Sequence, residues 1–147
     1  MKHLIYIFFL GVVFAQAQTD YNTKRDFVAE GYDVVSYFDN KAEKGHKDYK
    51  TTYDGVKYKF VSQAHLDIFT KNPKHYVPQY GGYCAYAIAE KGKKVSINPE
   101  TYEIRDDKLY LFYNSWGNNT LESWLEKDVK SLINKADQSW RLISDKD

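Results

Sequence analysis

The amino-acid sequence predicts a single α+β domain with a small antiparallel sheet, several short helices and a helical C-terminal tail. Two patterns predict this fold class. In the first pattern, apolar and polar side chains alternate around an Asp-Gly pair and again near residues 102–113. In the second, apolar residues recur at helical spacing in the segments between and after these two regions. The chain also has the length of one ordinary domain and contains no repeat with a period of about 20–50 residues.

Residues 1–17 have the layout of a secretory signal peptide. A basic front precedes an apolar run over residues 4–14, and Ala15 and Ala17 form a small-residue cleavage site. A membrane anchor is the alternative, but the run has about half of the roughly 20 residues that a spanning helix needs. We therefore expect an exported protein, periplasmic or secreted, that begins at Gln18 and has no integral membrane segment after cleavage.

The mature chain is expected to carry no net charge. The full sequence has 21 Lys and Arg and 20 Asp and Glu, and cleavage of the signal peptide removes one lysine. This balance provides no overall attraction to nucleic acid or to an acidic membrane surface, so we expect neither partner. Cys84 is the only cysteine, which excludes an internal disulfide and leaves stability to a core rich in aromatic residues.

The N-terminal part of the mature chain begins with polar residues. Residues 18–26 predict a flexible arm, and the domain starts near residue 27. Gly31 and Asp33 then interrupt an apolar segment, and Asp33 is a residue type that caps helix N-termini. A polar loop over residues 40–48 follows.

The clearest local signal is a β-hairpin over residues 49–62. Two alternating strands meet at Asp54 and Gly55, a dipeptide typical of two-residue hairpin turns. Ser62 is a natural N-cap for the next segment, residues 63–72, in which apolar residues recur at helical spacing. The sequence therefore predicts a strand–strand–helix unit here.

The C-terminal half returns to the same two patterns. Residues 83–92 are alanine-rich, end at a glycine and predict a short buried helix. Residues 94–114 alternate around a turn at Asp106 and Asp107 and predict strands. The tail over residues 115–144 is predicted to be mostly helical, with apolar positions at Trp116, Leu121, Trp124, Leu125, Val129, Leu132 and Ile133.

Cys84 is the first candidate for chemistry, because it follows a Gly-Gly pair in the stretch "PQYGGYCAYA". If the helix begins near Gly82, the thiol lies in the first turn, where the positive end of the helix dipole favours a thiolate. The alternative is a small buried core residue beside Ala85 and Ala87. The local sequence leaves both interpretations open.

His65 is the second candidate. It lies on the predicted helix after Ser62, at the edge of the inner face, where a structural boundary histidine is the alternative to a ligand. The chain lacks a C-x-x-C dithiol, an H-E-x-x-H zinc motif, an EF-hand loop, a Gly-rich phosphate loop and a G-x-S-x-G elbow. None of these chemistries is therefore indicated, and we assign no catalytic residue, although whether the protein is an enzyme stays open.

Several stretches, in order, resemble the YHS domain family. They are "GYDVVSYF", "YDGVKYKFVSQAHLDIF", "NPKHYVPQYGGYCAYA" and "DKLYLFYN", followed by a helical tail that contains tryptophan. The chain is most similar to the exported single-domain branch of this family. The resemblance covers residues 27–140 and leaves residues 141–147 as a C-terminal tail.

The resemblance implies a link to metal handling, because relatives occur in copper-transporting ATPases and metal sensors. Those forms use a motif F-C-S-x-x-C-x-x-x-F. Its phenylalanines fall on Phe60 and Phe69 and its serine on Ser62, but its two cysteine positions hold Val61 and His65. An all-cysteine zinc site is therefore excluded, whereas a site of different composition stays open.

Three functions compete on the sequence. The first is a metal-binding protein in which Cys84 and His65 hold copper or zinc, with Asp33 or a water as a further zinc ligand. The second is a non-catalytic structural or partner-binding module with a buried Cys84, whose protein partner is unknown. The third is an enzyme with a Cys84–His65 nucleophilic pair, for which the sequence supplies no third orienting group or oxyanion donor.

Overall fold

The structure, a computed structural model, describes residues 20–144 and confirms the mixed α+β class. Within the described residues the fold consists of three small sheets, five α-helices and three short 3-10 turns. The longest helix, α5 (Val129–Ile143), forms the C-terminal end of this part of the chain and extends into the predicted tail over residues 141–147.

The N-terminal half contains one four-stranded sheet and two helices. Strand β3 is antiparallel to β4, as the hairpin signal predicts, whereas β2 joins the sheet parallel to β4, in the order β1-β2-β4-β3. The elements are β1 (Thr23–Lys24), β2 (Phe27–Val28), η1 (Ala29–Gly31), η2 (Ser36–Asp39), β3 (His46–Tyr53), β4 (Val56–Phe60), α1 (Gln63–Lys71) and α2 (Pro73–Tyr76).

The C-terminal half contains two hairpins and three helices. Strands β5 and β6 pair antiparallel, as do the two-residue strands β7 and β8. The elements are η3 (Gln79–Gly82), α3 (Ala85–Lys91), β5 (Asn98–Arg105), β6 (Lys108–Phe112), β7 (Asn114–Ser115), β8 (Asn118–Asn119), α4 (Thr120–Leu125) and α5.

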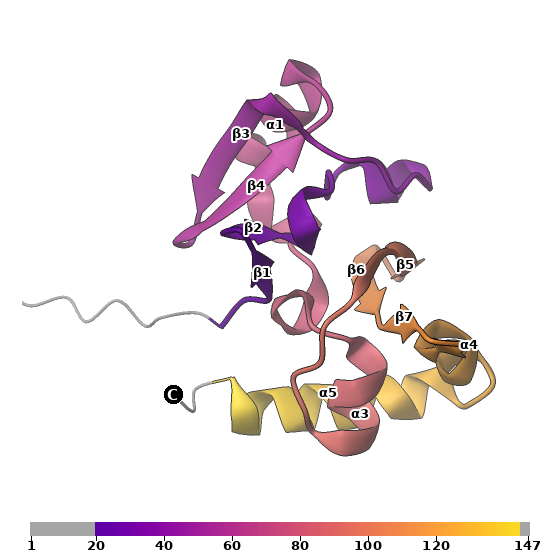
Figure 1. The fold of residues 1–147 in the computed structure, drawn as a ribbon. Coiled ribbons are helices and arrows are strands. Elements are labelled where there is room, and N and C mark those ends of the chain that lie inside the picture. The colour runs from indigo at the N-terminus through magenta and orange to yellow at the C-terminus, as the bar shows by residue number, and fades with distance from the viewer. Residues whose placement is uncertain (1–19, 145–147) are drawn as a thin grey trace, which may run out of the picture.

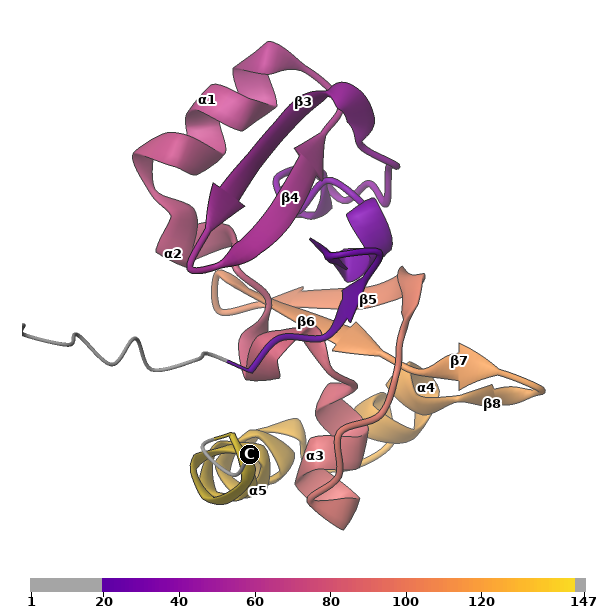
Figure 2. The same ribbon diagram turned by 60° about the vertical axis from the view of Figure 1, so that its left-hand side comes forward.

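The elements are arranged in three tiers. Figures 1 and 2 show the β3–β4 hairpin with α1 at one end of the molecule and helices α3 and α5 at the other. Strands β5 and β6 lie between these ends, and β1 runs past them on one side (Figure 2). The ribbons of α1 and α3 therefore lie at different ends of the fold, although buried residues of both helices, Phe69 and Ala87, belong to one hydrophobic cluster.

The first tier is held together by aromatic side chains around Phe69. Asp54 and Gly55 adopt positive φ values of 50° and 81°, the backbone that a tight hairpin turn requires. The resulting register directs Tyr58 and Phe60 inward, where their ring centroids lie 4.7 and 5.0 Å from that of Phe69. Each such fully buried aromatic side chain contributes about 1.5–3 kcal/mol by leaving water.

The opposite tier has a second core around Trp124. The indole is buried, its Nε1 donates to Glu103 Oε2 at 2.8 Å, and its ring centroid lies 5.3 Å from that of Phe112. Helix α5 contributes the buried residues Leu132 and Ala136, and the alanine-rich α3 presents small side chains to it. The predicted buried helix after the Gly-Gly pair is thus confirmed.

The described part of the predicted flexible arm makes tertiary contacts with the segment around the Gly-Gly pair. Asn22 donates from its backbone N–H to the carbonyl of Gly81 at 2.8 Å and from its side chain to Gly82 at 3.1 Å. Asp20 accepts a hydrogen bond from the Tyr83 hydroxyl and forms an ion pair with Lys94. These tertiary contacts have no local sequence signature, because the partners are about 60 residues away along the chain.

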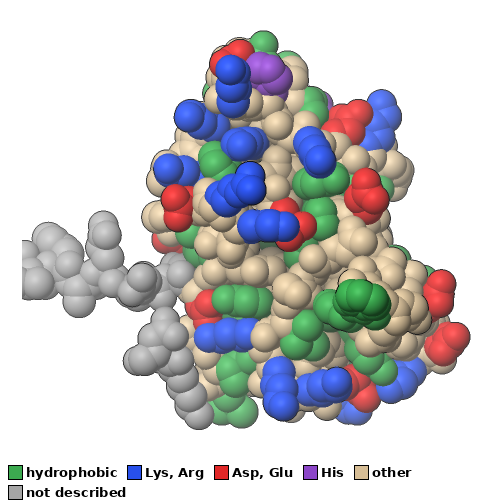
Figure 3. All heavy atoms as spheres, viewed as in Figure 1, with side chains coloured by type: hydrophobic (Ala, Val, Ile, Leu, Met, Phe, Trp, Pro, Cys, Tyr) green, Lys and Arg blue, Asp and Glu red, His purple; other side chains and the backbone are tan. Residues whose placement is uncertain are grey.

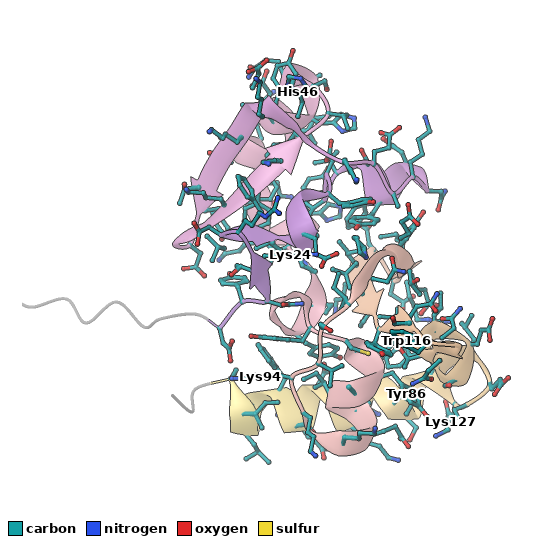
Figure 4. All side chains as sticks on the ribbon, in the orientation of Figure 1. Lys24, His46, Tyr86, Lys94, Trp116 and Lys127 are labelled. Atoms are coloured by element: carbon teal, nitrogen blue, oxygen red, sulfur yellow. The ribbon has the colours of Figure 1, made fainter. Side chains whose placement is uncertain are left out.

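The prediction that Trp116 lies on a helix is wrong. Trp116 has a φ of 54° and occupies, with Gly117, the turn between β7 and β8, where its side chain is 97% exposed (Figure 4). A single left-handed residue and a glycine make this tight turn, and the helical tail begins only at Thr120. Of the apolar residues predicted to be helical in this tail, Leu121 is the first that lies on a helix.

The predicted signal peptide, residues 1–17, lies outside the described residues. Among the helices that the structure describes, none combines the length and apolar character needed to cross a lipid bilayer.

Candidate functional site

Asp33 is a fully buried carboxylate between η1 and η2. Its Oδ1 accepts hydrogen bonds from the backbone N–H groups of Val35 and Ser36 at 2.8 and 3.2 Å. It therefore satisfies N–H donors at the start of η2, as a capping aspartate does at the start of a helix. Its Oδ2 accepts the N–H of Val61 at 2.9 Å, at the end of β4. A charge is tolerated in a core only when hydrogen bonds replace water, and these donors meet that requirement.

His65 supplies the remaining partner of this carboxylate. Its Nδ1 lies 2.7 Å from Asp33 Oδ2, and its backbone N–H donates to the side chain of Ser62, the N-cap of α1. Because an ionised carboxylate only accepts, we assign the proton of this hydrogen bond to Nδ1. The other ring nitrogen, Nε2, then faces Asp39, whose Oδ2 is 3.9 Å away.

The Asp33–His65 pair therefore joins the segment before η2 to the corner between β4 and α1. It also gives His65 a fixed ring orientation with one nitrogen directed at Asp39, whose side chain is 63% exposed. The Ser36 hydroxyl, which lies nearby in sequence, donates to Glu43 instead of His65. The arrangement can position an imidazole at the surface, and no nucleophile is bonded to it within the described interactions.

Cys84 lies apart from this pair. It is fully buried at the position before α3, and its Sγ is 3.3 Å from the Thr120 hydroxyl oxygen. That hydroxyl donates to the carbonyl of Tyr113 at 2.6 Å, so the thiol is the natural donor to it. The structure thus brings Asp33 and His65 together, whereas Cys84, at the start of α3, contacts Thr120 of α4.

The Gly-Gly pair before Cys84 makes a close backbone approach. Tyr80, Gly81 and Gly82 all have positive φ values, of 55°, 61° and 81°. A Cβ added to Gly81 would collide with the backbone oxygen of Asp20, so a glycine is needed where the N-terminal segment crosses. The "QYGGYC" stretch therefore acts in packing: it docks the N-terminal segment and leads the thiol into the core.

Burial also affects the ionisation of the neighbouring Tyr80. Removal from water raises the pKa of its phenol above the ordinary value, and the hydrogen bond to Asp137, at 2.9 Å, raises it further. Tyr80 therefore stays protonated at neutral pH and donates from η3 to α5. It is a structural link between η3 and α5.

The sequence did not indicate Asp39 or Thr120 as site residues. Asp39 follows Asp33 by six positions and carries no motif, although an acid at the end of a short polar turn is a weak signal. Thr120 meets Cys84 only because α4 folds back onto α3. Within the described residues, no group of three or more His, Cys, Asp or Glu side chains is arranged to hold a metal ion.

Comparison with known protein families matches the YHS domain to residues 34–80. The matched segment contains β3, β4, α1 and α2, includes His65 and ends before Cys84. Neither the curated proteins nor the solved structures contain a match to the chain. The order of the motifs, the hairpin followed by α1, and this match lead to one conclusion: residues 34–80 form a YHS domain.

Proposed function

We propose that the chain is a non-catalytic module of the exported single-domain branch of the YHS family, in which Cys84 is structural. The burial of Cys84 carries this proposal, because its side chain is fully buried and hydrogen-bonded to Thr120. A nucleophilic or redox thiol needs solvent access and a base or cation beside it. His65, the base that a nucleophilic pair would require, directs its two ring nitrogens at Asp33 and Asp39, whereas the Cys84 thiol contacts Thr120.

The rate of thiol alkylation tests this proposal. In the native protein we expect Cys84 to react with iodoacetamide only when the protein transiently unfolds. In denaturant the thiol should react at once. A Cys84→Ala, Ser115→Cys double variant supplies the matched reference, because Ser115 is exposed. Rapid native labelling of Cys84, at the rate of the reference thiol, would show that the thiol is accessible and would overturn the proposal.

Export rests on the pattern of residues 1–17. Expression of the full chain in a bacterial host, followed by fractionation and intact-mass measurement, should give a periplasmic or secreted species that begins at Gln18. A cytoplasmic species that retains Met1 would contradict export and would leave the conclusion about Cys84 untouched.

A second candidate function is binding of a copper or zinc ion at His65. The observation that favours it is the geometry of the imidazole, with Nδ1 held by Asp33 and Nε2 facing Asp39 at 3.9 Å. Histidines that bind metals through one nitrogen commonly donate the other N–H to a carboxylate. In this candidate Asp33 orients the ring and Asp39 is the second ligand.

Titration of Zn(II) and Cu(II) into the protein tests the second candidate. Binding should be lost in His65→Gln and weakened in Asp39→Asn, and it should be unchanged in Cys84→Ala. Loss of binding in Cys84→Ala would instead favour the site predicted from the sequence, with Cys84, His65 and Asp33. Equal binding by all variants would exclude both sites.

A further inference from the structure

One cavity of about 480 Å³ is lined by four cationic side chains. It opens on the face of the four-stranded sheet that points away from α1, because Lys59 alternates along β4 with the inward Tyr58 and Phe60. Lys and Arg side chains gather over the sheet on this side of the molecule (Figure 3), and Lys24, the last residue of β1, lies beside β2 (Figure 4). The lining residues are Lys24, Arg25, Phe27, Glu30, Tyr32, Lys44, Lys59 and Pro99.

The cations reach the cavity from separate parts of the fold. Arg25 comes from the β1–β2 turn, Lys44 from the loop before β3, and Lys59 from β4. The backbone holds them together: Tyr32 and Lys44 form an isolated β-bridge, and Gly45 packs so closely on Lys59 that it has no room for a Cβ. The tertiary structure therefore brings these cations together, and the overall net charge of the chain gives no sign of this local cluster.

Most of this positive charge has no carboxylate partner. The Lys24 ammonium pairs with Glu30 at 3.1 Å, and Lys59 Nζ lies 4.2 Å from the centre of the Phe27 ring. In the part of the chain that the structure describes, no carboxylate lies within ion-pair distance of Arg25, Lys44 or Lys59. Four cations and one carboxylate, that of Glu30, line the cavity, so the cations outnumber the counter-charge, and an anion placed among them would relieve their repulsion.

Backbone strain is concentrated at the same place. Arg25, Ala29 and Glu30 have positive φ values of 52°, 51° and 54°, although none of them is glycine. Each such conformation costs on the order of 1 kcal/mol and persists only where the surrounding structure enforces it. The strained turns bring Arg25 and Glu30 to the rim of the cavity.

We propose that this cavity binds a small phosphate-bearing molecule. The dianionic phosphate would lie among Arg25, Lys44 and Lys59, while Phe27 and Tyr32 offer apolar surface to the organic part. The cavity has the size of a small-molecule site, which favours a soluble ligand over a membrane or a nucleic acid. This ligand goes beyond the structural module proposed above and uses neither Cys84 nor His65.

Calorimetric titration at constant ionic strength tests the proposal, with inorganic phosphate, pyrophosphate and glycerol phosphate as probes. We expect saturable binding with one site. Lys59→Gln and, separately, the exposed Arg25→Gln should each weaken it about tenfold, the effect of losing one charged hydrogen bond. Lys50→Gln is the matched control, because Lys50 pairs with Lys59 across the same sheet but does not line the cavity.

Three results would overturn the proposal. The first is the absence of saturable binding by every probe while thermal unfolding shows a folded protein. The second is an equal loss of affinity in Lys50→Gln, which would indicate a diffuse basic surface. The third is binding to phosphatidylglycerol-containing vesicles, or to a single-stranded oligonucleotide, without binding to glycerol phosphate. None of these results would alter the accessibility of Cys84, so the two proposals fail separately.

Discussion

Asp33 connects three segments of the chain through a single buried carboxylate. Its oxygens accept from the turn before η2, from the end of β4 and from His65 on α1. A buried charge with a full set of donors costs little, whereas the same site with one mismatched partner is strongly unfavourable. The pair is therefore a sensitive point of the fold whether or not a metal ion binds at His65.

The substitution Asp33→Asn should destabilise the protein by about 2–4 kcal/mol. The amide would present N–H groups where Val61 and His65 already donate, so donors would face each other in the core. Urea unfolding followed by circular dichroism measures the loss. Asp39→Asn is the control, because that side chain is 63% exposed, and it should change stability by less than about 0.5 kcal/mol. Similar losses in both variants would refute the argument.

Two buried tyrosines should respond in opposite ways to loss of their hydroxyl. Among the described residues, the Tyr58 hydroxyl has no hydrogen-bond partner, whereas that of Tyr37 donates to the Pro99 carbonyl at 2.6 Å. Tyr58→Phe should therefore raise the free energy of unfolding by about 1 kcal/mol, and Tyr37→Phe should lower it by about the same amount. Chemical denaturation of both variants measures this free energy. A decrease in Tyr58→Phe as large as that in Tyr37→Phe would contradict the prediction.

At the residue scale, the sequence identified His65 and Asp33 individually but could not show that they pair. Each has a local sequence signal: Asp33 is a residue type that caps helices, and His65 lies on a predicted amphipathic helix. Their contact spans 32 residues and depends on how η2 packs against the corner before α1. Cys84 shows the same limit, because its partner Thr120 lies 36 residues away.

The elements that the sequence predicted well are those with local signals. The hairpin followed from its Asp-Gly turn, α1 from the Ser62 cap and α3 from its composition, and all three are present. The parallel contact of β2 with β4 and the docking of the N-terminal segment depend on distant partners. Short strands such as β7 and β8 have too few residues to show a period.

The crossing of the N-terminal segment over η3 should depend on Gly81. Gly81→Ala would place a Cβ against the Asp20 backbone oxygen, whereas Gly55→Ala has the same kind of positive φ and open space around it. In both variants an alanine in the left-handed conformation should lower the free energy of unfolding by about 1 kcal/mol. In Gly81→Ala, overpacking should lower it by roughly a further 1–3 kcal/mol. Thermal or urea unfolding measures both, and equal losses would show that the crossing is easily displaced.

At the scale of the whole molecule, the segment that matches the YHS family does not contain its own complete core. Tyr37, Phe60 and Phe69 belong to the same hydrophobic cluster as Leu109 and Leu111 of β6, outside residues 34–80. So short a fragment buries too little apolar surface to offset its conformational entropy. We expect a peptide of residues 34–80 to be unfolded by circular dichroism, whereas residues 20–144 should fold. Cooperative thermal unfolding of the short peptide would disprove this dependence.

The tyrosine-rich core also makes stability depend on alkaline pH. Burial raises the pKa of Tyr37 and Tyr58 well above the ordinary value, and it raises that of Tyr110 to about 12. In the unfolded chain these phenols ionise near pH 10, at about their unperturbed pKa. Above that pH the folded state binds more protons than the unfolded state, so the free energy of unfolding falls as the pH rises. Below it both states are protonated, and this contribution to stability is fully present.

Thermal unfolding followed across the alkaline range should therefore show a constant midpoint up to about pH 9 and a steep decline above about pH 10. Ultraviolet absorbance should show part of the tyrosinate signal appearing together with unfolding, since the buried phenols ionise only when exposed. The double variant Tyr37→Phe, Tyr58→Phe removes two of the shifted groups, so its midpoint should decline less steeply than that of the wild type. Parallel declines in the two proteins would mean that other groups, such as the surface lysines, control alkaline unfolding.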